Sequence, residues 1–172
     1  MALDMLEGGH GPTVFDLDPA AERLTGAGAC PREVGAASDV AVTMPPEPRH
    51  VETVVLGPDG VADGLRPGGV VVDTSTTDPQ TSRRVGAEPR RRGLHVVESP
   101  VGKTPEHAAT GTPTSMAGGE PGIIARVKPV LDRMGSEIFL CGGPGMGHAM
   151  KITNNLLATT VVAANTGASA IG

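Results

Sequence analysis

Two polar residues near the C-terminus, Lys151 and Asn155, have types and a spacing that suit proton transfer. A glycine-rich turn is predicted to end at Gly147, and an uninterrupted helical pattern follows from about His148. Residues four apart lie on one face of a helix, so the two side chains would stand one turn apart. A lysine in the first turn faces the positive end of the helix dipole, which lowers its pKa. Lys151 is thus a candidate proton donor and acceptor, with a solvated surface lysine beside a capping asparagine as the simpler alternative.

The composition bears on which partners the chain can have. Its 172 residues are enough for a core, and its net charge of −5 without a long basic run makes nucleic acid an unexpected partner. The two cysteines and five histidines show no metal-ligand spacing, so we predict free thiols and no metal. No apolar run reaches the length of a membrane span. We therefore expect a cytoplasmic protein without a membrane partner.

Short apolar strands alternate with helices along the chain. Strands are predicted at residues 13–16, 39–44, 69–73, 94–97, 112–117 and 137–140. Helices are predicted at residues 1–7, 19–24, 31–37, 49–56, 79–92 and 121–134 and from 148 onward, and Pro89 should strain or shorten its helix. This alternation is typical of a parallel sheet in an α/β fold.

Ligands of such folds bind beyond the carboxyl ends of the strands. Asp16, Met44, Ser75, Thr76 and the loop from Ser99 all fall at such ends, so the pattern predicts a site there. Two of these positions keep a simpler interpretation. Asp16 suits a helix-capping acid, and an ordinary strand-end turn would look the same at Met44.

Several motifs along the chain, taken together and in order, point to one family. They are Val14-Phe-Asp16, Thr43-Met-Pro-Pro46, Asp73-Thr-Ser-Thr-Thr77, Gly118-Gly119 and Lys151-x-x-Asn154-Asn155. In this order they resemble the β-hydroxyacid dehydrogenases, the family of 3-hydroxyisobutyrate dehydrogenase and tartronate semialdehyde reductase. The resemblance implies a Rossmann-like, doubly wound and mostly parallel sheet without its first strand, followed by the start of a long interdomain helix. Residues 1–142 would then be a truncated NAD(P)-binding domain, and residues 143–172 the interdomain helix and the start of a helical C-terminal domain.

The loop Pro100-Val-Gly102-Lys103-Thr104 resembles, within that family, the loop of sulfolactaldehyde reductases. The resemblance implies that Gly102, Lys103 and Thr104 face the acid group of the substrate, with Lys103 in place of an arginine that holds a sulfonate. A lysine supplies a point charge where an arginine supplies a bidentate fork. A solvated loop lysine is the alternative for this position.

The resemblance also implies a reaction, namely NAD(P)-dependent hydride transfer between a small β-hydroxyacid, or a 3-hydroxy sulfonate, and its aldehyde. Lys151 would be the general acid and base. Asn155 and Ser75 would bind the substrate, which is a small anion.

The cofactor side of the implied site consists of four residues. Asp16 would accept hydrogen bonds from the adenosine ribose, Thr76 would approach the nicotinamide ribose, and Met44 and Pro45 would line the cleft. A carboxylate at Asp16 repels a 2′-phosphate, so NAD is favoured over NADP.

The glycine fingerprint of dinucleotide-binding folds is missing from the sequence. Gly143-Pro-Gly-Met-Gly147 has His148 where the third glycine should stand. We therefore expect a fragment that lacks the N-terminal fingerprint and the helical C-terminal domain, and a homo-oligomer at full length. Two alternatives stay open: an inactive fragment that serves only as a binding or dimerisation module, and a decarboxylating sugar-acid dehydrogenase of the same superfamily.

Overall fold

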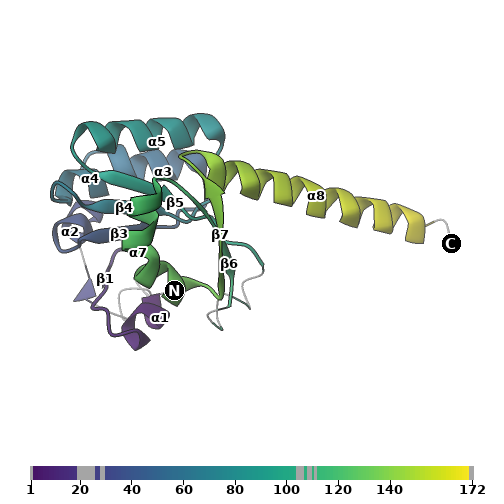
Figure 1. Ribbon diagram of the computed structural model, residues 1–172, viewed down its shortest axis with the longest axis horizontal. Helices are drawn as coiled ribbons and strands as arrows, with labels where there is room; N and C mark the ends of the chain where they lie inside the picture. Colours follow the sequence, from purple (N-terminus) through teal and green to yellow (C-terminus); the bar gives the residue numbers. More distant parts are fainter. Residues whose placement is uncertain are drawn as a thin grey trace.

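The computed structural model describes residues 2–18, 26–27, 30–103, 107, 110 and 112–170. Its strands are β1 (Thr13–Val14), β2 (Gly26–Ala27), β3 (Val40–Thr43), β4 (Val70–Asp73), β5 (His95–Glu98), β6 (Thr114–Gly118) and β7 (Glu137–Gly142). The last five form one sheet in the order β3-β4-β5-β6-β7, and β1 pairs with β2 separately (Figure 1). Within the larger sheet only the β5–β6 pair is antiparallel. The predicted, mostly parallel sheet is therefore confirmed.

Helices cover both faces of this sheet. The helices of the described residues are α1 (Ala2–Glu7), α2 (Pro31–Ala36), α3 (Pro48–Leu56), α4 (Val61–Gly64), α5 (Pro79–Arg91), α7 (Pro121–Met134) and α8 (Met146–Ser169). Successive side chains of a strand point to opposite faces. Accordingly, Val71 of β4 packs into a core with α3, α4 and α5, whereas Val70 and Val72 pack into a second core with α1 and α7 (Figure 1). This two-sided arrangement is the doubly wound, Rossmann-like fold that the sequence predicts.

Some predicted elements differ from the structure in extent. The strand predicted at residues 13–16 is only Thr13–Val14 and is half-buried. Pro89 does not shorten α5, because it lies in the last turn and its carbonyl oxygen accepts from Arg92 N at 2.9 Å and Leu94 N at 3.0 Å. The helix predicted at residues 19–24 lies outside the described residues.

One helix, α4, has no counterpart in the prediction. Its Gly64 lies against α2 so closely that a methyl group there would stand 1.9 Å from the carbonyl oxygen of Arg32. A single turn held by contact with another helix has too little periodicity to be predicted from sequence.

The long helix α8 projects from the rest of the protein (Figure 1). Beyond Lys151, each of its residues is exposed. In the described part of the chain, no helix combines the length and apolar character that crossing a bilayer requires. No group of metal-ligating side chains gathers among the described residues either, and Cys30 and Cys141 are free thiols.

Candidate active site

Three neighbouring strands end on buried polar residues at one edge of the sheet. Thr43, Asp73 and Glu98 close β3, β4 and β5, and they are paired with one another in register. Asp73 is 2% exposed and Glu98 is 5% exposed. Partner residues on adjacent parallel strands stand side by side, so two buried acidic residues end neighbouring strands at this edge.

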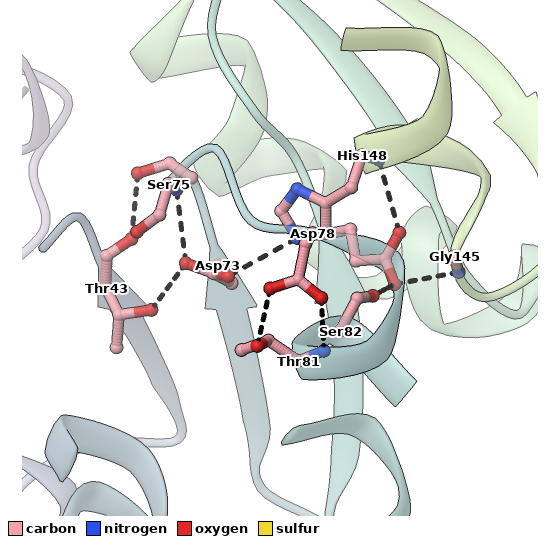
Figure 2. A network of polar contacts seen from close by, with 10 residues as sticks. Thr43, Asp73, Ser75, Asp78, Thr81, Ser82, Gly145 and His148 are labelled. Carbon is pink, nitrogen blue, oxygen red and sulfur yellow. Dashed lines mark hydrogen bonds and ion pairs between the residues drawn. The ribbon is translucent and has the colours of Figure 1, made fainter. Parts of the chain in front are cut away.

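The Asp73 carboxylate is held by three elements. Its Oδ1 accepts from Thr43 Oγ1 at 3.1 Å and from the backbone N–H of Ser75 at 3.1 Å. Its Oδ2 lies 3.3 Å from Nε2 of His148 in the first turn of α8 (Figure 2). These contacts satisfy the carboxylate and connect β3, the loop after β4 and α8.

The Glu98 carboxylate lies at the start of α8. Gly145 N donates to its Oε1 at 2.7 Å, and His148 N contacts its Oε2 at 3.5 Å. Ser82 of α5 also donates to Oε1 (Figure 2). Gly145, the N-cap of α8, has no side chain of its own to cap the helix, so a carboxylate from another strand takes that role.

Lys151 is the sixth residue of α8, so the prediction that it lies in the first turn is wrong. The helix begins earlier because the left-handed residue, at φ 90°, is Gly145, while Gly147 is already helical. Burial of the half-buried Lys151 amine lowers its pKa. The predicted direction of the shift is confirmed, and its cause is desolvation by burial. Asn155 follows one turn further on and is exposed.

The residues predicted after β3 and β4 lie at the same edge. Ser75 is buried, Thr76 and Met44 are exposed, and Pro45 is half-buried. Since β3 and β4 are neighbours, their exit loops meet beside Asp73. The binding roles assigned to these four residues stay predictions.

The predicted acid-binding loop lies elsewhere. Gly102 N donates to Thr114 O at 2.7 Å, and Lys103 has a left-handed backbone with φ 69°. The Lys103 ammonium donates to Thr112 O at 2.8 Å and lies 3.4 Å from Ser136 Oγ. These partners precede the amino ends of β6 and β7, whereas α8 follows the carboxyl end of β7. The structure thus shows no contact between Lys103 and α8, and Thr104 lies outside the described residues.

Asp16 is exposed, two residues beyond β1. Its Oδ1 accepts from the backbone N–H of Asp18 at 2.9 Å. This is the local bond expected of a capping acid, and it leaves the ribose-binding role of Asp16 a prediction.

Sequence reasoning missed the buried polar residues that surround Lys151's helix. Glu98 lies one residue beyond the predicted strand. The sequence indicates a structural or solvated His148, and the structural alternative agrees with a side chain that is 1% exposed and paired with Asp73. Three buried polar atoms near this edge, within the described residues, have no hydrogen-bond partner: Ser75 Oγ, Thr77 Oγ1 and His148 Nδ1. Buried polar groups are ordinarily satisfied, so these atoms fit a site that receives a polar ligand such as a nucleotide cofactor.

Comparison with known proteins identifies the family of the chain. The family model described as the NAD binding domain of 6-phosphogluconate dehydrogenase matches residues 1–143. The chain is 34% identical to an NAD-dependent L-serine dehydrogenase of Pseudomonas aeruginosa, over 100% of this chain and 59% of the relative. It is 38% identical to a 3-sulfolactaldehyde reductase of Escherichia coli, over 91% of this chain and 54% of the relative.

Two solved structures also superpose on most of the chain. A 3-hydroxyisobutyrate dehydrogenase from Salmonella typhimurium superposes with a TM-score of 0.88 at 32% identity, over 97% of this chain and 60% of that one. The Mycobacterium tuberculosis 3-hydroxyisobutyrate dehydrogenase, solved with L-serine, gives a TM-score of 0.83 at 28% identity, over 91% of this chain and 55% of that one. The chain therefore spans between half and three fifths of the length of these relatives.

Proposed function

We propose, from the premise that this chain belongs to the family of NAD-binding domains of 6-phosphogluconate dehydrogenase, that it is part of an NAD-dependent oxidoreductase. Its substrate would be a small anionic β-hydroxyacid, or a 3-hydroxy sulfonate, and the corresponding aldehyde. Relatives named as dehydrogenases and reductases of such hydroxyl compounds support this substrate class.

The partial burial of the Lys151 amine is the observation that supports this chemistry most. The amine is half-buried just beyond the sheet edge, and burial lowers its pKa. An amine with a lowered pKa exchanges protons more readily near neutral pH than an exposed lysine does. Lys151 can therefore act as acid in one direction and as base in the other.

The proton steps follow from this role. NAD, when bound, supplies the hydride acceptor for oxidation, and its reduced form supplies the hydride for reduction. In oxidation the neutral Lys151 amine takes the proton of the substrate hydroxyl. In reduction the Lys151 ammonium gives that proton to the carbonyl oxygen. Asn155, one helical turn on, would hold the substrate by a hydrogen bond, and Ser75 would hold it from the loop after β4.

Cofactor binding would use the residues that follow β1, β3 and β4. Asp16 would bind the adenosine ribose and would favour NAD over NADP by repelling a 2′-phosphate. Thr76 would lie near the nicotinamide ribose, with Met44 and Pro45 along the cleft. We also propose that Gly102, Lys103 and Thr104 bind the acid group of the substrate, which would require Lys103 to exchange its present partners for the ligand.

The proposal is tested by titrating NAD into the 172-residue chain and then following absorbance at 340 nm. The panel consists of L-serine and 3-hydroxyisobutyrate with NAD, and of 3-sulfolactaldehyde with NADH. Because the glycine fingerprint is missing, we expect weak binding that favours NAD over NADP, and we expect at least one compound to change the absorbance. A chain that binds neither dinucleotide and turns over none of the three compounds would contradict the proposal.

A second candidate is a module that binds a partner or a second copy of itself without catalysis. The exposed apolar residues of α8 favour it, among them Leu156, Leu157 and Val162. They also support the proposed domain boundary near residue 142, with residues 143–172 as the interdomain helix and the start of a helical C-terminal domain. Light scattering that shows an oligomer, together with NAD binding and no turnover, would favour this candidate.

A further inference from the structure

Asp73 and Glu98 are two buried carboxylates at the sheet edge, and other groups must stabilise them there. They are partner residues on adjacent strands, and both are almost fully buried. A carboxylate that is taken out of water is costly to bury unless hydrogen bonds replace its hydration. Two buried carboxylates are stable only if other groups offset their lost hydration. The groups in contact with Asp73 and Glu98 therefore indicate the role of these two residues.

Three of the six contacts to these carboxylates come from one short stretch, residues 145–148 at the start of α8, and the others come from Thr43, Ser75 and Ser82. The N–H of Gly145 donates to Glu98, and the N–H of His148 lies against the same carboxylate. The imidazole of His148 faces the other carboxylate, that of Asp73 (Figure 2). A single helical turn thus meets both carboxylates, Glu98 through its backbone and Asp73 through a side chain.

Close packing fixes this turn against the neighbouring strand as well. A methyl group at Gly147 would lie 2.6 Å from the carbonyl oxygen of Met116, and one at Gly118 would lie 2.4 Å from Gly147 N. The helix backbone therefore rests directly on the backbone of β6. Contacts with β4, β5 and β6 leave the turn little freedom to slide or rotate.

We propose that Asp73 and Glu98 form a carboxylate pair that receives the first turn of α8, and that Glu98 is a positioning residue for Lys151. Lys151 lies three residues beyond His148 on the same continuous helix, so the position of its amine follows from the position of that turn. Glu98 has the larger part because its carboxylate faces two backbone N–H groups at the start of α8, whereas Asp73 contacts one side chain there. The inference rests on the proposed role of Lys151 where it concerns turnover, but the docking of the helix can be measured without it.

The test compares Glu98→Ala and Glu98→Gln with a matched control, Glu120→Gln. Glu120 stands at the N-cap of α7 but makes no capping hydrogen bond, so its change alters charge without altering a helix start. Three quantities are measured on each full chain: the affinity for NAD, kcat at 340 nm, and the acylation rate of Lys151 relative to Lys128 by mass spectrometry. Lys128 is an exposed lysine on α7 and serves as the internal reference.

In Glu98→Ala we expect kcat to fall by about ten- to a hundredfold, the loss that a displacement of about 1 Å at a reacting group causes, with the affinity for NAD unchanged. Measured above pH 10.5, where lysine amines are largely neutral, Lys151 should be acylated faster relative to Lys128, because a loosened helix start exposes its amine. Glu98→Gln keeps a carbonyl oxygen that can accept from Gly145 N, so it should recover part of both effects. Glu120→Gln should match the unaltered chain.

The proposal is overturned if Lys151 acylation and kcat stay at the level of the unaltered chain in both Glu98 variants. It is also overturned if kcat, NAD affinity and melting temperature fall together while the acylation ratio is constant, because that pattern shows a merely structural role. Should Glu98→Ala fail to fold, the Glu98→Gln chain decides by the same measurements. Should no substrate turn over, the proposed function fails, yet the acylation ratio still decides whether the carboxylate pair docks α8.

Discussion

Replacement of Gly147 by alanine should disturb both stability and turnover, because the start of α8 touches β6 through this residue. The added methyl group would meet the carbonyl oxygen of Met116 at 2.6 Å, whereas ordinary contact begins at 3.4 Å. Helix and strand must therefore separate by about 0.8 Å, and an overpacked contact of this kind costs about 1–3 kcal/mol. A displacement of this size, carried along α8 to Lys151, should lower kcat by about ten- to a hundredfold.

Urea denaturation and initial rates at 340 nm measure the two effects on the same protein. Gly167→Ala is the matched control, because Gly167 lies in the same helix and nothing stands within 4 Å of an added methyl group. Alanine is the better helix former, so the control should keep its stability or gain slightly. The packing argument is refuted if Gly147→Ala unfolds at the same urea concentration as the unaltered chain and keeps its kcat.

Three further predictions concern titration, capping and the core. Turnover in the oxidising direction should rise with pH through the pKa of Lys151, which burial places below the ordinary 10.5, and reduction should fall over the same range; initial rates across pH check this. Asp78→Ala should lower the melting temperature, because the Asp78 side chain caps α5 and its hydrogen bond from Thr81 Oγ1 lowers its pKa. The stability that the Asp78 carboxylate contributes is present above pH 3.8 and is lost as pH falls through the lowered pKa. The difference in melting temperature between the unaltered chain and Asp78→Ala should therefore shrink in acid. Leu131→Ala, at a site 1% exposed, should cost about 2–5 kcal/mol in urea denaturation, whereas Leu156→Ala, at a site 68% exposed, should cost little.

The sequence predicts elements well where burial is continuous. β4 is buried on both faces, so its three valines form an unbroken apolar run that ends at Asp73. α7 is predicted to the residue, because Pro121 suits the first helical position and Gly135 ends the apolar periodicity. Local chemistry decides both cases, and both predictions are confirmed.

The start of α8 could not be predicted in this way. Glycines stand at positions 143, 145 and 147, and the sequence does not tell which of them takes the left-handed backbone. The structure assigns it to Gly145 and uses Gly147 for close packing on β6. Packing against a distant strand, and not local preference, selects between them.

The polar residues of the candidate site were predicted unevenly for a related reason. Strand ends pointed to Ser75 and Met44 because they follow apolar runs along the chain. Glu98 and His148 make contacts across 47 and more residues, and their importance depends on which strands become neighbours. Sheet order is a property of the whole fold, so no short motif carries this information.

The most direct measurement of the central claim is the kcat of Lys151→Ala beside that of Lys128→Ala, on the substrate with the fastest turnover and with NAD affinity measured in parallel. Loss of a general acid and base should lower kcat by about 10²–10⁴-fold in Lys151→Ala and leave NAD binding intact. Lys128, an exposed lysine paired with Asp132 on α7, should be replaceable without effect. Undiminished turnover in Lys151→Ala would contradict the assignment of the proton transfer to this amine.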